Sequence, residues 1–163
     1  MSRYVFFSFH YENDINRSMI VRNSWITQDR TAAGFIDKAD FESIKRCGNE
    51  AVHKWIDNQL VGTSVTVVLI GSETLKRPFV QYEICSSLKR GNAVIGVHIS
   101  GVKDMITSQI ESKENTHTII GYYDDGTPAY FDIIATGIYD YVNQDGYKNL
   151  GLWIESAAQS AGK

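Results

Sequence analysis

Cysteine is scarce in this chain. Among its 163 residues there are two, Cys47 and Cys85, and neither lies in a C-x-x-C or metal-ligand pattern. A short secreted domain usually carries more cysteines, spaced as a disulfide framework. Two isolated cysteines are typical of a reducing compartment. We therefore expect a cytoplasmic protein whose stability does not rest on disulfides.

Long hydrophobic runs are missing as well. The first apolar segment, residues 5–9, is too short for the core of a signal peptide, and no small-residue cleavage site follows it. No segment approaches the roughly 20 apolar residues that cross a bilayer. The net charge of −3 gives no reason to expect nucleic acid or an acidic membrane as a partner. We expect neither partner.

Several common enzyme motifs are also absent. The sequence has no G-x-G-x-x-G and no G-x-x-x-x-G-K-[ST], so it supports neither a Rossmann dinucleotide loop nor a P-loop. It has no G-x-S-x-G elbow, which argues against an α/β-hydrolase. Its four histidines lack an H-E-x-x-H pattern and partner cysteines, and we expect no metal site.

What the sequence does contain is an alternation of strand and helix patterns. Apolar, β-branched segments predict strands at residues 4–9, 32–37, 65–70 and 93–99. Helical spacing predicts helices at residues 13–26, 42–60 and 78–89, with Gly48 as a weak point and Pro78 in a first turn. This alternation is typical of a parallel sheet with helices on both faces. The length fits a single domain over residues 1–163, with a core at residues 1–100.

The pattern after residue 100 is less regular. Residues 102–116 resemble a polar loop, and the sequence DDGTP at residues 124–128 favours a hairpin between two short apolar segments. Residues 138–158 are expected to be helical, with an interruption near Asp145 and Gly146. We interpret residues 101–163 as a C-terminal hairpin and helix added to the core.

One carboxylate draws attention because of its place on the predicted third helix. Ligands of open α/β sheets bind beyond the carboxyl ends of the strands, where such helices begin. Phe79 and Glu83 are four residues apart and share a face at the flank of the apolar stripe formed by Val80, Ile84 and Leu88. Glu83 should therefore lie near the crevice. Position alone nevertheless favours the simpler interpretation, a boundary glutamate stabilised by the helix dipole.

Several motifs together resemble one family. The segment VFFSFHY (residues 5–11) resembles the opening strand of TIR and TIR-like domains. Phe79 and Glu83 resemble the W-x-x-x-E helix motif, with phenylalanine in place of tryptophan. With VRNSW, TSVTVVLIGSETL, YEI and GNAVIGVHI, residues 4–99 are similar to the TIR-like proteins of the Thoeris antiphage system. Beyond Val102 the resemblance is general.

This resemblance implies a flavodoxin-like fold and an enzyme that cleaves NAD. Glu83 matches the essential helix glutamate, so the resemblance makes it the catalytic residue. The enzyme would release nicotinamide and make a cyclic or otherwise modified ADP-ribose signal that activates a separate antiphage effector. NAD is then the substrate, and no resident cofactor is expected. A phage-derived trigger and self-association are consistent with such a role.

The other candidate residues lie near the ends of the predicted strands or on neighbouring helices. Ser8 and Phe9 are expected to contact the nicotinamide ribose and ring, unless they only end the strand. The remaining substrate-binding candidates are His10 (a phosphate ligand or a loop-ordering residue), Asn23, Asp37 (a ribose ligand or a turn cap), Ser72 (a contact or a helix N-cap) and Phe79.

Two other functions stay open. A non-catalytic TIR-like interaction module would share the fold, although the intact Glu83 argues against it. A nucleoside deoxyribosyltransferase-like enzyme would also place a glutamate near a ribose, so the carboxylate alone does not separate the two, and the VFFSFHY opening favours the TIR-like interpretation.

Overall fold

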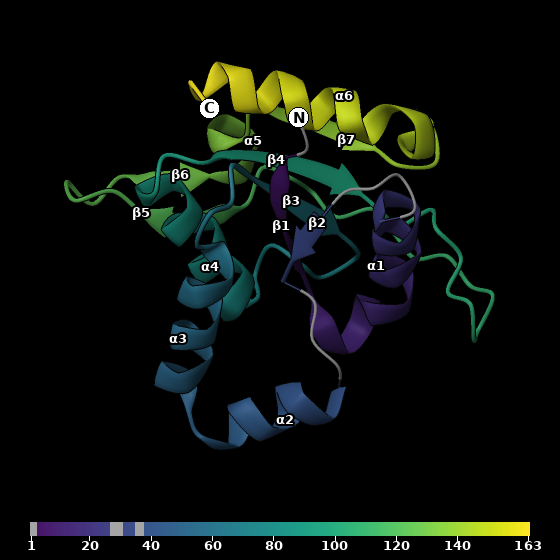
Figure 1. Cartoon of the computed structure of the whole chain (residues 1–163), viewed down its shortest axis with the longest axis horizontal. Coiled ribbons are helices and arrows are strands. Elements are labelled where there is room, and N and C mark those ends of the chain that lie inside the picture. Colours follow the sequence, from purple (N-terminus) through teal and green to yellow (C-terminus); the bar gives the residue numbers. More distant parts are fainter. Residues whose placement is uncertain (1–2, 27–30, 35–37) are drawn as a thin grey trace.

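The protein is built on a five-stranded parallel sheet with strand order β2-β1-β3-β4-β7 (Figure 1). The computed structural model describes residues 3–26, 31–34 and 38–163. The strands are β1 (Tyr4–Phe9), β2 (Thr31–Ala33), β3 (Val65–Ile70), β4 (Ala93–His98) and β7 (Gly137–Asp140). All neighbouring strands pair in parallel. Because the chain steps from β1 to β2 on one side and to β3 on the other, the order is flavodoxin-like, and this prediction is confirmed.

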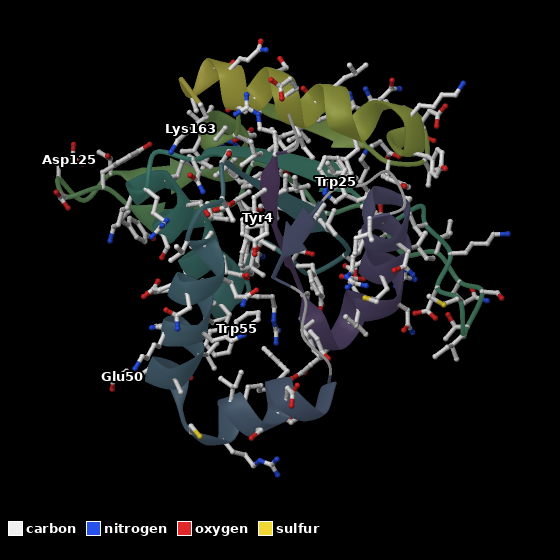
Figure 2. All side chains as sticks on the ribbon, viewed as in Figure 1. Tyr4, Trp25, Glu50, Trp55, Asp125 and Lys163 are labelled. Carbon is white, nitrogen blue, oxygen red and sulfur yellow. The ribbon has the colours of Figure 1, made fainter. Side chains whose placement is uncertain are left out.

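Helices cover both faces of the sheet, as expected. On one face, α1 (Tyr11–Ile26) and α6 (Gly146–Ser160) pack on a core that includes Trp25 and Ile154. On the other face lie α3 (Asn49–Leu60) and α4 (Pro78–Lys89). Figure 2 shows Trp25 on the α1 side and Trp55 on the α3 side, well separated. The short α2 (Lys38–Arg46) packs on α3 and lies away from the sheet in Figure 1.

The two-residue period of β1 decides which side chains reach which face. Val5, Phe7 and Phe9 point into the core under α1 and α6. Phe6 points the opposite way and packs on α3, and Ser8 shares that side. The hydroxyl of Ser8 is therefore directed towards α4.

The buried stripe of α4 differs from the expected one. Its buried residues are Val80, Glu83, Ile84 and Ser87, whereas Leu88 is 39% exposed. Each step of four residues turns a helix by about 40° beyond a full circle, so Leu88 has rotated out of the stripe that begins at Val80. Ser87 takes the inner position and shares a 2.6 Å hydrogen bond with Thr66 of β3.

Two predicted helices have different boundaries in the structure. The helix expected over residues 42–60 is divided into α2 and α3 at Gly48, whose φ of +97° is a conformation that glycine adopts without strain. The helix expected over residues 138–158 is wrong at its start. Residues 137–140 form β7, because pairing with β4 outweighs local preference, and α6 begins at Gly146.

The hairpin prediction is confirmed. β5 (Ile119–Tyr122) and β6 (Pro128–Tyr130) pair in antiparallel fashion, and the short α5 (Phe131–Ile134) follows. Phe131 is fully buried and anchors this segment in the core beside α4. Within the described residues, no helix combines the length and the hydropathy needed to cross a membrane.

Candidate active site

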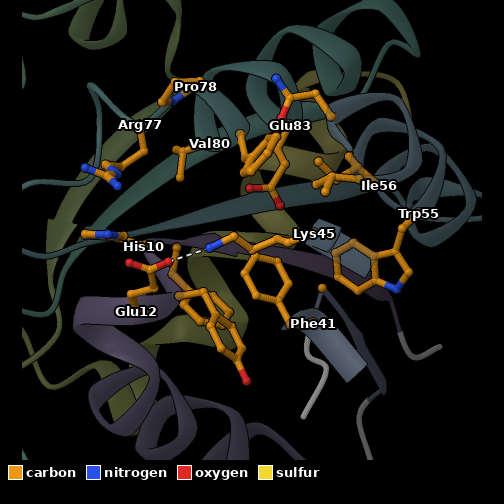
Figure 3. A pocket seen from close by; sticks show the side chains of 16 residues that line it. His10, Glu12, Phe41, Lys45, Trp55, Ile56, Arg77, Pro78, Val80 and Glu83 are labelled. Carbon is orange, nitrogen blue, oxygen red and sulfur yellow. Dashed lines mark hydrogen bonds and ion pairs between the residues drawn. The ribbon is translucent and has the colours of Figure 1, made fainter. Parts of the chain in front are cut away.

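A cavity of about 340 Å³ opens where β1 and β2 end and α4 begins. This is the point in the strand order where the chain changes direction, and ligands of such sheets bind there. Its volume falls within the range of small-molecule sites. Side chains from the starts of α1 and α4 and from α2 and α3 form its walls (Figure 3).

Glu83 lies in the wall of this cavity and is 7% exposed. Its Oε1 accepts a hydrogen bond of 3.1 Å from Ser8 Oγ. Burial raises the pKa of Glu83 to about 8, and the hydrogen bond from Ser8 partly offsets this effect. The site therefore contains a carboxyl group that can change its protonation state near neutral pH.

Ser8 is fully buried and does not line the cavity. Its hydroxyl contacts Glu83, so its link to the site runs through that carboxylate. The sequence predicts that Ser8 contacts the ribose directly. In the structure Ser8 instead contacts Glu83, the residue that is predicted to face the ribose.

Phe9, His10 and Phe79 line the same cavity as Glu83. Both ring nitrogens of His10 are buried without a hydrogen-bond partner among the described residues. Burial and then the charge of Arg77 lower the pKa of His10, so its ring is neutral near pH 7. The structure therefore brings together four of the predicted residues.

Two other candidates, Asn23 and Ser72, do not line the cavity. Asn23 is exposed, and it lies twelve residues, or roughly 18 Å, along α1 from the helix start that borders the site. Ser72 Oγ donates a 2.8 Å hydrogen bond to Glu111 Oε2, and neither residue lines the cavity. Ser72 is not the N-cap of α4 either, since that position belongs to Arg77. Asp37 lies outside the described residues.

The cavity also contains residues that the sequence interpretation missed. Glu12 and Lys45 line the cavity and form an ion pair of 2.6 Å, and the ring of Tyr11 stacks on Phe41 at 4.4 Å. Arg77 could have been found, because it directly precedes Pro78 at the start of α4. The lining residues on α2 and α3 could not have been predicted from the sequence, since nothing in their spacing shows that these helices enclose the site.

Metal ligands are not gathered in the part of the chain that the structure describes. No group of three or more His, Cys, Asp or Glu side chains there is arranged to hold an ion. The chemistry of the cavity therefore has to be argued from its carboxylate, its cationic groups and its aromatic walls.

Comparison with known proteins assigns the family. A family model described as "Thoeris protein ThsB, TIR-like domain" matches residues 6–104. A Bacillus cereus (strain MSX-D12) protein named "Putative cyclic ADP-D-ribose synthase ThsB1" is 33% identical over 94% of this chain and 100% of its own length. Among solved structures, the CMP N-glycosidase BcmB of Clostridium botulinum has a TM-score of 0.46 and 12% identity, over 93% of this chain and 99% of that one. That last similarity is too low to bear on activity. The first two matches establish that the chain belongs to the ThsB family of TIR-like proteins of the Thoeris antiphage system.

Proposed function

We propose that this protein cleaves the nicotinamide–ribose bond of NAD and converts the ADP-ribosyl group into a cyclic ADP-ribose signal. The observation that carries the proposal is the position of Glu83, buried in the wall of a cavity at the strand-order switch point. The ThsB1 relative, whose name describes a cyclic ADP-ribose synthase, supports the same chemistry. The signal would diffuse to a separate antiphage effector, and a phage-derived trigger would start its synthesis.

The proposed reaction requires one carboxylate and a cavity that positions the substrate. Breaking the glycosidic bond creates positive charge on C1′ and the ring oxygen of the ribose, and a carboxylate beside the sugar stabilises that charge. Nicotinamide leaves as a neutral molecule, so no general acid is required. An attacking water then gives ADP-ribose, whereas attack by a group of the same nucleotide gives a cyclic product.

The raised pKa of Glu83 fits this role if substrate binding is coupled to proton release. With a pKa of about 8, the carboxyl group holds a proton at pH 7. The nicotinamide ring of NAD is cationic, and a nearby positive charge favours the ionised carboxylate. Substrate binding would therefore release the proton and produce the anion that the transition state needs.

Glu83→Gln tests the proposal directly. Wild-type and variant protein are incubated with NAD, alone and with lysate from phage-infected cells, and nicotinamide and nucleotide products are measured by mass spectrometry. We expect the variant to lose at least about 100-fold in rate, the scale of losing a group that stabilises transition-state charge. Glu50→Gln, an exposed glutamate on α3, is the matched control and should keep full activity.

Two outcomes would contradict the proposal. Equal nicotinamide release by wild type and Glu83→Gln would exclude Glu83 as the catalytic carboxylate. Unchanged phage protection by that variant would favour a non-catalytic interaction module. Parallel reactions with CMP and deoxynucleosides separate NAD cleavage from a general N-glycosidase or deoxyribosyltransferase activity.

A further inference from the structure

We propose that His10, Arg77 and Lys45 form a phosphate subsite, which orients a nicotinamide nucleotide with its base towards Trp55. This inference rests on the proposed function and adds to it the direction in which the substrate lies. All four side chains line the cavity that contains Glu83.

The first argument is the supply of unused donors. Both ring nitrogens of His10 are buried with no hydrogen-bond partner in the part of the chain that the structure describes, and in its neutral form the ring carries one N–H. Arg77 makes no side-chain hydrogen bond or ion pair with any described residue, although its guanidinium carries five N–H donors. Buried polar atoms are usually paired, so the unpaired, buried ring nitrogens of His10 indicate a polar ligand, whereas Arg77 is exposed at the edge of the same cavity. The forked donors of arginine suit phosphate oxygens.

The second argument concerns Lys45, whose ammonium group already pairs with the carboxylate of Glu12. Its Nζ lies 2.6 Å from Glu12 Oε1 and 5.5 Å from the centre of the Phe41 ring. Figure 3 shows this ion pair facing the interior of the cavity, with His10 and Arg77 on the same side. An incoming phosphate can take the place of the Glu12 carboxylate, and Lys45 then becomes its third cationic or polar contact.

The third argument is the order of chemical groups along the cavity. Figure 3 places His10 and Arg77 at one end, Trp55 and Ile56 at the other, and Glu83 between them. In a nicotinamide nucleotide, the base at C1′ and the C5′ phosphate are attached through the two carbons that flank the ring oxygen, so they extend from opposite ends of the ribose. With Glu83 beside the ribose and the phosphate at His10 and Arg77, the base must point to the aromatic end. The reverse orientation would press a dianionic group against Trp55 and Ile56, which is unfavourable.

The inference is tested by comparing two substrates that share the scissile bond. Nicotinamide riboside has the same glycosidic bond as NAD but no phosphate. For Arg77→Gln we expect kcat/KM for NAD to fall about 10-fold or more, and kcat/KM for nicotinamide riboside to stay within about 2-fold of wild type. Glu12→Gln removes the competing carboxylate and should raise kcat/KM for NAD several-fold. Arg90→Gln, an exposed arginine at the opposite end of α4, is the matched control.

The results separate this inference from the proposed function. An equal loss with both substrates, or no loss with NAD, would overturn the phosphate subsite and leave NAD cleavage standing. If the wild type cleaves neither substrate, isothermal titration with ADP-ribose and with inorganic pyrophosphate decides the question. Binding that is lost in Arg77→Gln and kept in Arg90→Gln supports the subsite independently of catalysis, and binding that is equal in both variants refutes it.

Discussion

Glu83 and Ser8 form a pair in which a fully buried hydroxyl donates a hydrogen bond to a carboxyl group in the cavity wall. The hydroxyl donates to Oε1 at 3.1 Å, and its effect on the pKa of Glu83 is opposite to that of burial. Because Ser8 does not line the cavity, any effect of changing it on catalysis has to pass through Glu83. We therefore propose that Ser8 is a positioning residue, and this role can be tested separately from substrate contact.

Ser8→Ala should raise the pKa of Glu83 further, since the ionised carboxylate loses its hydrogen-bond donor. We expect the rising limb of the plot of kcat/KM for NAD against pH to move to higher pH, with activity at pH 7 reduced less than in Glu83→Gln. Thr66→Val is a matched control, because it removes a hydrogen bond to Ser87 on the same buried face, and Ser87 Oγ donates to the backbone carbonyl oxygen of Glu83 and not to its carboxyl group. A pH profile that is unchanged in Ser8→Ala, or shifted equally by both variants, would refute the positioning role.

The buried Glu83 should also cost stability as the pH rises. Its pKa is about 8 in the folded protein against an ordinary 4.5, so between these pH values the folded state binds more protons than the unfolded state. Stability then falls with rising pH across this window. Glu83→Gln removes the penalty, and its gain in Tm over wild type should grow from pH 5 to pH 8, by roughly 2–4 °C for each kcal/mol. Thermal melts check this prediction.

Its control is Glu50→Gln, whose difference in Tm from wild type should not change with pH because the side chain is exposed. The comparison between variants matters because Asp14, raised to a pKa of about 8 by burial and by Glu111, adds its own pH dependence to every melt. A Tm difference for Glu83→Gln that stays constant or shrinks towards pH 8 would show that Glu83 is not a buried, protonated carboxyl group.

The sequence correctly predicts that Glu83 lies at the crevice, but it predicts the places of the other candidate residues only in part. The four-residue spacing from Phe79 and the proximity to Pro78 placed the carboxylate near the crevice, where the structure has it. Ser8 was assigned to the substrate because its position after an apolar run indicates a strand end. Its orientation towards α4 depends on the register of β1 against β3, which the sequence does not give. Asn23 was proposed from the VRNSW motif alone, and a helix that runs back along the sheet carries it away from the site.

At the scale of elements, the loop between β4 and β5 is fastened to α1 by one buried arginine. Arg17 Nε donates to the carbonyl oxygen of Val102 at 2.9 Å, and Nη2 donates to that of Gln109 at 2.8 Å. Nη1 lies 3.3 Å from Asp14 Oδ1 and 3.8 Å from Glu111 Oε1. The start of α1, which borders the cavity, is therefore held against a long segment without regular structure.

Arg17→Lys should weaken this connection, since an ammonium group cannot reproduce the forked geometry that reaches two carbonyl groups at once. We expect the free energy of unfolding to fall by about 1–3 kcal/mol, the cost of leaving buried hydrogen-bonding groups unpaired. Denaturant unfolding measures the loss, and hydrogen exchange should become faster at residues 102–111. Lys45→Arg at the exposed ion pair with Glu12 is the comparison and should change stability little. Unaltered exchange in the loop of Arg17→Lys would show that other contacts hold it.

The presence of a helix or strand was easier to predict than the residues at which it begins and ends. Strands β1, β3 and β4 are almost wholly apolar and buried, so their composition alone identified them. The strand β7 was missed because it depends on pairing with β4, a distant part of the chain. The division between α2 and α3 is local: it falls at Gly48, the weak point of the predicted helix.

At the scale of the whole molecule, the boundary that the sequence analysis places at residue 100, between the core and the C-terminal elements, falls within one sheet and one core. β7 extends the sheet beyond β4, and α6 covers the face that it shares with α1. Leu150 and Ile154 are 2% and 1% exposed. Burial of these two side chains contributes roughly 3–6 kcal/mol, against a typical total stability of about 5–15 kcal/mol. The C-terminal third is thus part of the structure that holds the site in place.

A chain that ends at residue 116 should therefore fail to fold cooperatively. It would leave the edge of β4 unpaired and expose the apolar face that α6 covers, and unpaired edges promote aggregation. We expect no sharp thermal transition and strong binding of a hydrophobic dye. A chain that ends at Ser160, and so keeps all of α6, should retain the wild-type transition, because residues 161–163 are exposed and the carbonyl oxygen of Lys163 makes only a surface contact with Arg3. If residues 1–116 unfold cooperatively and still release nicotinamide from NAD, the first two-thirds of the chain form a complete domain, and the C-terminal elements are dispensable for the site.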